Sequence, residues 1–284
     1  MKKLVFTLAT CCIMCACEQK TETNPFFTEF RTEYGAPDFD KIKIEHYEPA
    51  FLKGIEEQNA EIKAIVESRE TPGFENTIVA LDNSGRTLAR VKGVFYALTE
   101  ADTNDEMSAL SEKIAPVLSE HNDNIYLNQD LYKRVAAVWQ QEQEGKITLT
   151  TEQHRLLDRY YKAFIRSGAG LDAGKQNRLR EINKELSTLA ITFSNHVLNE
   201  NNAYRLVIDN EAELAGLPEW VKTGAAEEAK AVGKEGKWLF TLQNSSRLPL
   251  LQYADNRELR KDIYEAYINR GNNGDANDNK EILK

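Results

Sequence analysis

Apolar residues recur every three or four positions through most of this 284-residue chain, with polar residues between them. That spacing places the apolar side chains on one face of a helix, so it predicts amphipathic helices. Several of them begin with a recognisable cap, such as Asn128, or Thr150 with Gln153 in a capping box. The expected helices span residues 49–66 with Pro49 in the first turn, 78–98, 105–122, 128–144, 150–166, 172–200, 218–233 and 256–270.

The longest of these helices covers residues 172–200, and its apolar positions form a single stripe. A stripe of this kind normally faces the protein core. We therefore expect the following side chains to be buried: Leu179, Ile182, Leu186, Leu189, Phe193 and Val197.

Two segments depart from the helical period. Residues 204–208 and 238–242 are short apolar runs, each bounded by polar residues or glycine, and this pattern predicts strands. After residue 25 we find no internal repeat, low-complexity tract or domain boundary. The expected fold class is therefore mainly α, with one multi-helix unit over residues 25–284 and a small patch of β-sheet.

The end of the chain has the pattern of a helix start. Asp278 and Glu281 stand in the positions of a capping box, so a helix is expected to begin at Asp278. Only three residues follow Glu281, whereas an isolated helix needs roughly 12 to be even marginally stable. We therefore expect that the chain is cut within a helix and that a longer protein contains it.

The first residues have the three zones of a secretory signal. Met1-Lys2-Lys3 precedes an apolar run over residues 4–14, which is too short for the roughly 20 residues that span a bilayer. Ala16-Cys17 resembles a bacterial lipobox, although Met14 and Cys15 stand where Leu and a small residue are commoner. We expect a signal peptide over residues 1–16, a lipidated Cys17, and a polar tether over residues 17–24, with plain secretion as the alternative.

This interpretation places the protein outside the cytoplasm, anchored by lipid to a bacterial envelope membrane, facing the periplasm or the cell surface. Cleavage before Cys17 removes Lys2 and Lys3 and no acid, which moves the formal net charge from −9 to −11. An acidic chain of this kind does not bind nucleic acid through its overall charge. Cys17 would be the only cysteine left, so stability must come from a conventional apolar core.

The usual catalytic motifs are absent from the sequence. The four histidines, His46, His121, His154 and His196, are far apart, and no His-Glu-x-x-His places two of them on one helix face around zinc. Spacing does not address a site built from distant histidines. No Gly-x-Ser-x-Gly elbow occurs, and no unmodified cysteine remains as a nucleophile.

Two segments resemble known ligand-binding loops in sequence. Residues 168–173 match the dinucleotide fingerprint, but they follow a predicted helix where the fingerprint needs a strand, so we interpret them as a helix-helix turn. Asp275, Asn277 and Asn279 resemble the start of a calcium loop, yet Lys280 occupies the position of the turn glycine. A polar loop leading into the last helix is the better interpretation. By itself the sequence shows no active site.

Several stretches together resemble the N-terminal half of the peptidyl-dipeptidase and thimet oligopeptidase family of zinc metallopeptidases. Their order and their coverage of residues 24–284 carry the resemblance, and the bacterial peptidyl-dipeptidase branch looks most similar. The stretches are residues 24–27, 37–42, 46–51, 72–78, 166–171, 214–218, 256–260, 264–267 and 270–271.

The resemblance implies a mainly helical fold in which two halves enclose a deep channel with zinc at its floor. In the family, a His-Glu-x-x-His helix and a downstream Glu hold the metal, and the first Glu acts as general base on the zinc-bound water. None of these residues has a counterpart here. We therefore expect no catalytic, cofactor-binding or metal-binding residue in this chain, and zinc only in the intact parent.

The residues that carry the resemblance are expected to be structural. Phe74 and Ile78 are expected in the core, and Asn76 as a cap. Gly168 and Gly170 are expected as turn glycines, and Arg257 and Arg260 as partners in ion pairs between helices.

Two functions follow. The first is that of an inactive N-terminal fragment of a lipid-anchored zinc oligopeptidase, whose parent removes C-terminal dipeptides from short peptides and whose missing C-terminal half packs on this one. The alternative is a naturally short, non-catalytic lipoprotein that binds peptides or a partner protein. It predicts that residues 25–284 fold cooperatively by themselves.

Overall fold

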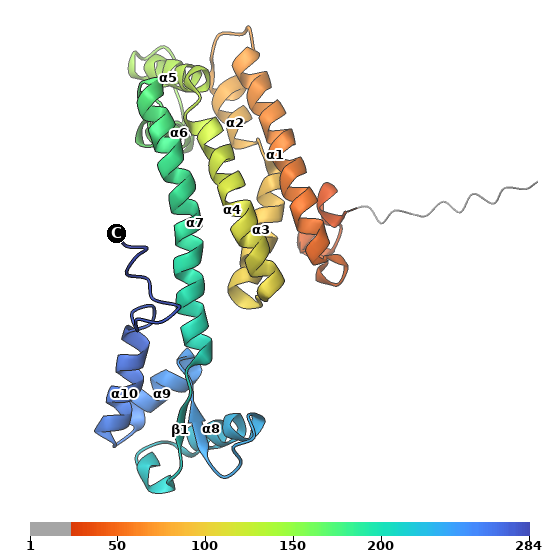
Figure 1. The fold of residues 1–284 in the computed structure, drawn as a ribbon. Coiled ribbons are helices and arrows are strands. Elements are labelled where there is room, and N and C mark those ends of the chain that lie inside the picture. Colours follow the sequence, from red (N-terminus) through yellow and green to blue (C-terminus); the bar gives the residue numbers. More distant parts are fainter. Residues whose placement is uncertain (1–23) are drawn as a thin grey trace, which may run out of the picture.

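The computed structural model describes residues 24–284, and in this part the chain is mainly α-helical with one two-stranded sheet (Figure 1). The expected fold class is therefore confirmed. The predicted signal peptide over residues 1–16, the lipidation site Cys17 and most of the tether lie outside the described residues. Within residues 24–284, none of the helices is both long enough and apolar enough to cross a membrane.

The first part of the chain is a group of helices. They are α1 (Ile44–Glu67), a π-helix (Phe74–Val79) that continues into α2 (Ala80–Asp82), α3 (Arg86–Ala101), α4 (Asp105–Tyr126), α5 (Gln129–Gln143) and α6 (Thr151–Arg166). The capping predictions are confirmed at α5 and α6. Asn128 accepts hydrogen bonds from two backbone N–H groups, and Thr150 and Gln153 exchange both bonds of a capping box.

Two apolar clusters hold this group together. One lies where α1, α3 and α4 meet and is rich in aromatic rings, with Phe51 and Phe95 packed edge to face at 5.3 Å between ring centres. The other joins the end of α1 and the π-helix to α5 and α6, and includes Ile78, Leu131 and Phe164. These clusters bury most of the apolar faces that the sequence pattern predicts for the first six helices.

The second part of the chain is smaller and follows the long helix α7 (Ala173–Ala203). The strands β1 (Leu206–Ile208) and β2 (Trp238–Phe240) pair antiparallel, with Val207 opposite Leu239. The helices α8 (Glu219–Ala231), α9 (Asn244–Tyr253) and α10 (Arg257–Ile268) pack around this ribbon. Both predicted strands and the helices expected over 218–233 and 256–270 are confirmed. Figure 1 shows α7 running from the first helices to this smaller part.

The predicted burial of the α7 stripe is wrong. Leu186 is 56% exposed, Phe193 37% and Ile182 36%, and the only buried residues of α7 are Gln176 and Glu200, near its two ends. The helix packs on α4 through polar side chains instead: Asn183 donates to Asp123 at 2.7 Å, and Asn195 donates to Glu112 at 2.9 Å. Leu179, Leu189 and Val197 are half-buried, so residues 24–284 cover the apolar face of α7 only in part and leave Ile182, Leu186 and Phe193 exposed.

Three other expectations need correction. Helix α1 begins at Ile44, so Pro49 lies inside it and not in its first turn. The helix expected over 78–98 is interrupted by a turn ending at Gly85, whose φ of 73° lies in the left-handed region. Helix α9 was not predicted, because Pro249 within it and the polar residues at its start obscure the helical period.

The helix expected from Asp278 is also wrong, because that residue is held in a loop. Its carboxylate accepts hydrogen bonds from the backbone N–H of Gly274 at 2.6 Å and of Lys280 at 2.9 Å. Glu281 pairs with Lys284 and does not reach back to cap the chain. Residues 280–283 form only a turn.

The contact between α1 and α3 depends on a glycine. A Cβ atom added at Gly54 would lie 2.8 Å from the backbone of Leu88 on α3, whereas one added at Gly93, also inside a helix, would meet nothing within 4 Å. Gly54→Ala should therefore force the helices apart and lower the free energy of unfolding by about 1–3 kcal/mol in urea titrations. The matched control Gly93→Ala should raise it by up to about 1 kcal/mol. A stabilised Gly54→Ala variant would contradict this packing.

Candidate functional site

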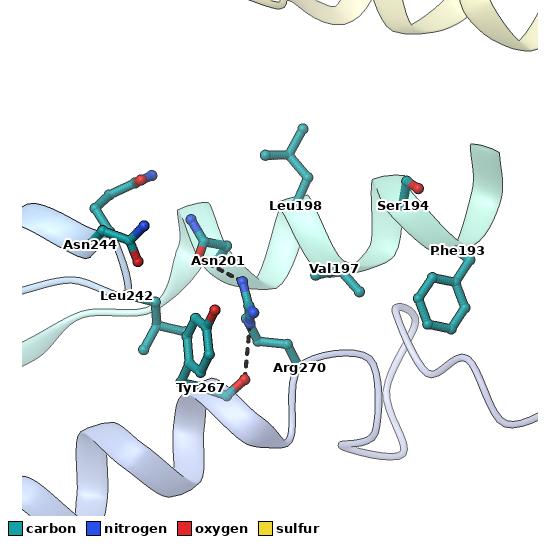
Figure 2. Close-up of a pocket in the computed structure, with 10 residues that line it drawn as sticks. Phe193, Ser194, Val197, Leu198, Asn201, Leu242, Asn244, Tyr267 and Arg270 are labelled. Atoms are coloured by element: carbon teal, nitrogen blue, oxygen red, sulfur yellow. Dashed lines mark hydrogen bonds between the residues drawn. The ribbon is translucent and has the colours of Figure 1, made fainter. Parts of the chain in front are cut away.

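A cavity of about 410 Å³ lies between α7 and the end of α10 (Figure 2). One wall is apolar and comes from α7, with Phe193, Val197 and Leu198. The opposite side carries the ring of Tyr267 and the guanidinium of Arg270. The cavity therefore combines an aliphatic surface with a cation, which suits an amphipathic ligand better than a purely apolar one.

Arg270 is fixed by three contacts. Its Nη1 donates to Oδ1 of Asn201 at 3.0 Å, and its Nε donates to the carbonyl oxygen of Tyr267 at 2.9 Å. Its guanidinium carbon lies 3.8 Å from the centre of the Tyr267 ring. Figure 2 shows both hydrogen bonds as dashed lines from the guanidinium.

The segment after α10 is held against α7 by buried polar contacts. Oε2 of Glu200 accepts hydrogen bonds from the backbone N–H of Gly271 and from Nδ2 of Asn273, both at 2.8 Å. Asn279, only 2% exposed, pairs with His196 at 2.8 Å. This docking fixes the position of Arg270 relative to α7, because Arg270 directly precedes Gly271.

The same contacts explain why the calcium-like loop does not converge on one point. Oδ1 of Asp275 accepts from the backbone N–H of Asn277, and the side chain of Asn279 turns toward α7. The interpretation of this segment as a polar loop is confirmed, although it does not lead into a helix.

The four histidines lie apart, and each has its own partner. His46 accepts from the backbone N–H of Lys43, His121 contacts Gln58, His154 contacts Glu142, and His196 contacts Asn279. Among residues 24–284 no three His, Cys, Asp or Glu side chains are grouped so that they could hold a metal ion. The residues of this part of the chain therefore do not fit a zinc centre.

A second, polar cavity of about 190 Å³ lies among α1, α3, α4 and α6. His121 is buried in its wall, with Nε2–H donating to Oε1 of Gln58 at 2.8 Å and Nδ1 unpartnered. Burial lowers the pKa of His121, and the charge of Lys92 lowers it further. Nearby, the hydroxyl of Tyr160 donates to Asp82 at 2.8 Å, and burial together with that carboxylate raises the pKa of Tyr160.

The residues that carry the family resemblance are structural in most cases. Ile78 is fully buried, Phe74 packs against the same cluster, and Oδ1 of Asn76 accepts from the backbone N–H of Gly73 as a cap. Gly168 has a φ of 91° in the turn between α6 and α7, which confirms the helix-helix turn; Gly170 has no left-handed φ.

The ion pairs expected for the two arginines are wrong. Nη1 of Arg260 donates to the carbonyl oxygens of Ala254 and Asp255, which satisfies backbone acceptors at the end of α9. Arg257 is exposed and pairs with no carboxylate among residues 24–284. The sequence could not show whether these arginines bond carboxylates or backbone carbonyl oxygens, because that depends on which helices become neighbours.

Comparison with known proteins finds that the chain is similar to part of several peptidases. The chain is 38% identical over 264 residues to the dipeptidyl carboxypeptidase of Escherichia coli, a match that covers 93% of this chain and 38% of that protein. It is 31% identical over 266 residues to oligopeptidase A of Escherichia coli, covering 92% of this chain, and 25% identical over 203 residues to saccharolysin of Saccharomyces cerevisiae. No protein-family model matches the chain.

These relatives confirm the resemblance that the motifs indicate. Homologues of the chain are dipeptidyl carboxypeptidases and oligopeptidases A, and the identity is higher to the former. The chain spans little more than a third of the length of these relatives.

The buried His121 makes the stability of the fold depend on pH. Because its pKa is lower in the folded chain than its ordinary value of 6.5, the unfolded chain takes up the proton first as the pH falls. This contribution to stability is intact above about pH 6.5 and is lost below it. Urea unfolding at pH 7.5 and 5.5 should therefore show a smaller loss on acidification in His121→Gln than in the parent chain. His154→Gln, at an exposed histidine, is the control. An undiminished loss in His121→Gln would overturn this assignment.

Proposed function

We propose that this chain is the N-terminal portion of a longer zinc-dependent oligopeptidase that removes C-terminal dipeptides from short peptides. The observation that carries the proposal is the match of 93% of the chain, at 38% identity, to 38% of a dipeptidyl carboxypeptidase. The motifs that resemble the family occur in order from Asn24 onward, which supports a match to the family as a whole.

The uncovered face of α7 gives independent support. A stripe that includes Ile182, Leu186 and Phe193 lies open along one helix, although its spacing is that of a core-facing face. Exposed apolar surface of this kind usually marks a contact with another part of a protein. In the proposed longer protein, the remaining portion covers this stripe and closes the peptide channel.

The metal belongs to that remaining portion. The histidines of residues 24–284 are dispersed and already partnered, so zinc has no place among them. The family resemblance puts the His-Glu-x-x-His helix in the remainder of the parent. The chain by itself is therefore expected to hydrolyse no peptide.

We further propose that Cys17 is acylated and holds the protein on a bacterial envelope membrane. The charged start, the short apolar run and Ala16-Cys17 support this, together with the polar residues that follow. In this position the enzyme would act on short peptides outside the cytoplasm.

One experiment tests the activity and the anchor together. The gene is expressed with the sequence that follows the codon for Lys284, and dipeptide release from an N-blocked tripeptide is measured in membrane and soluble fractions. We expect release in the membrane fraction, loss of release on chelation and recovery with zinc, whereas the 284-residue chain releases nothing. Cys17→Ser should move the activity to the soluble fraction, and Cys15→Ser should leave it on the membrane.

Two results would contradict the proposal. A stop codon directly after Lys284 in the genome would exclude the longer peptidase and favour the short non-catalytic lipoprotein. A longer protein that is loaded with zinc but releases no dipeptide would exclude the assigned reaction.

A further inference from the structure

Two arginines make cation–π contacts with the same tyrosine ring at the edge of this cavity. The guanidinium carbons of Arg247, on α9, and Arg270 lie 3.6 and 3.8 Å from the centre of the Tyr267 ring. Two guanidinium groups do not fit on one face of a ring at these distances, so the ring lies between them. Each cation is attracted to a π-face, and the ring keeps the two like charges apart.

Neither arginine has an ion-pair partner within residues 24–284. No carboxylate lies within 4.0 Å of either guanidinium, and their hydrogen-bond partners are neutral: the side chains of Asn244 and Asn201 and the carbonyl oxygen of Tyr267. Arg247 is only 8% exposed, and its Nε has no partner. A buried cation is ordinarily paired with an anion, because its desolvation is otherwise uncompensated. Of the two arginines only Arg270 lines the cavity, and no carboxylate pairs with it there, because the neighbouring Glu200 is engaged by Gly271 and Asn273.

The cavity in front of Arg270 indicates the chemistry of the missing group. Nε and Nη1 of Arg270 are engaged, but Nη2 has no partner among the described residues, and the amides of Gln243 and Asn244 line the same cavity. A carboxylate accepts hydrogen bonds from a guanidinium in a planar arrangement. The aliphatic wall formed by Val197 and Leu198 suits the carbon chain that carries such a carboxylate. A bare inorganic anion would leave this wall without a partner.

We propose that this cavity binds a carboxylate carried by a peptide chain, with Arg270 contacting the carboxylate and Tyr267 and Arg247 supporting its guanidinium. The source of the carboxylate follows from the proposed function. It is either the free C-terminus of a short peptide or an acidic side chain in the remainder of the parent protein. Both sources present the same chemistry to Arg270.

The proposal can be tested on the full 284-residue chain. The probes are N-acetyl-dialanine, its C-terminal amide and inorganic phosphate, and the signals are the Nε–H resonances of ¹⁵N-labelled arginine. We expect the free acid to shift the Arg270 and Arg247 resonances in a saturable manner, and the amide to shift neither. Arg270→Gln should weaken binding of the acid at least tenfold, about the loss of one charge-assisted hydrogen bond. Arg257→Gln, at an exposed position at the start of α10, should leave it unchanged.

Several outcomes would overturn the proposal: no shift with the acid, equal shifts with acid and amide, saturable binding of phosphate but not of the acid, or equal binding in Arg270→Gln and Arg257→Gln. The comparison of acid with amide needs no variant, so it decides the question even if Arg270→Gln does not fold.

The same titration on the longer protein distinguishes the two sources. If the site takes a peptide terminus, the acid still binds there, and Arg270→Gln still weakens it. If a side chain of the parent fills the site, the acid is excluded, and Arg270→Gln lowers the melting temperature of the parent more than Arg257→Gln does. Both results support a carboxylate site. Failure of the longer protein to release dipeptides would contradict the proposed function without changing the titration of the 284-residue chain.

Discussion

The structure depends on α7 being held at both ends by buried polar side chains. At its start, Nε2 of Gln176 donates to the carbonyl oxygens of Gly168 and Ala169, and near its end Glu200 accepts from Gly271 and Asn273. A buried side chain that loses such a partner is left with an uncompensated desolvation penalty, so these bonds fix where the helix lies. They connect the larger helical part to the smaller one, while Ile182 and Leu186 in the middle of α7 remain exposed.

The apolar face of α7 and the cavity beside it are consequences of this arrangement. Because α7 meets α4 through amide and carboxylate side chains, part of its apolar stripe, Ile182, Leu186 and Phe193, stays exposed within residues 24–284. The docking of the last loop on α7 brings Arg270 next to Asn201 and forms the cavity. The stripe and the unpaired arginines both point to groups that residues 24–284 do not supply: an apolar surface and a carboxylate. The similarity to part of dipeptidyl carboxypeptidase supports the proposal that a longer protein supplies those groups.

Helix caps were predictable from the sequence, whereas the elements that pack against each helix face were not. Asn128 and Thr150 indicate where helices begin, because a cap needs only residues within the same turn. The exposure of Leu186 could not be predicted, because periodicity identifies an apolar face and not what covers it. For the same reason the sequence did not reveal the cavity: Tyr267 and Arg270 are three residues apart in the chain, but Arg247 and Asn201 reach them only through the fold. The family emerged from the order of short motifs, which does not require knowledge of the fold.

The central claim is that the apolar face of α7 is an internal surface of a longer protein. The most direct measurement compares the free energy of unfolding of Leu186→Ser in the 284-residue chain and in the longer protein, by urea titration. In the chain this side chain is 56% exposed, so the change should stay within about 0.5 kcal/mol. In the longer protein the same substitution should cost at least about 2 kcal/mol, as expected for a buried leucine. Equal and small effects in the two proteins would contradict the account.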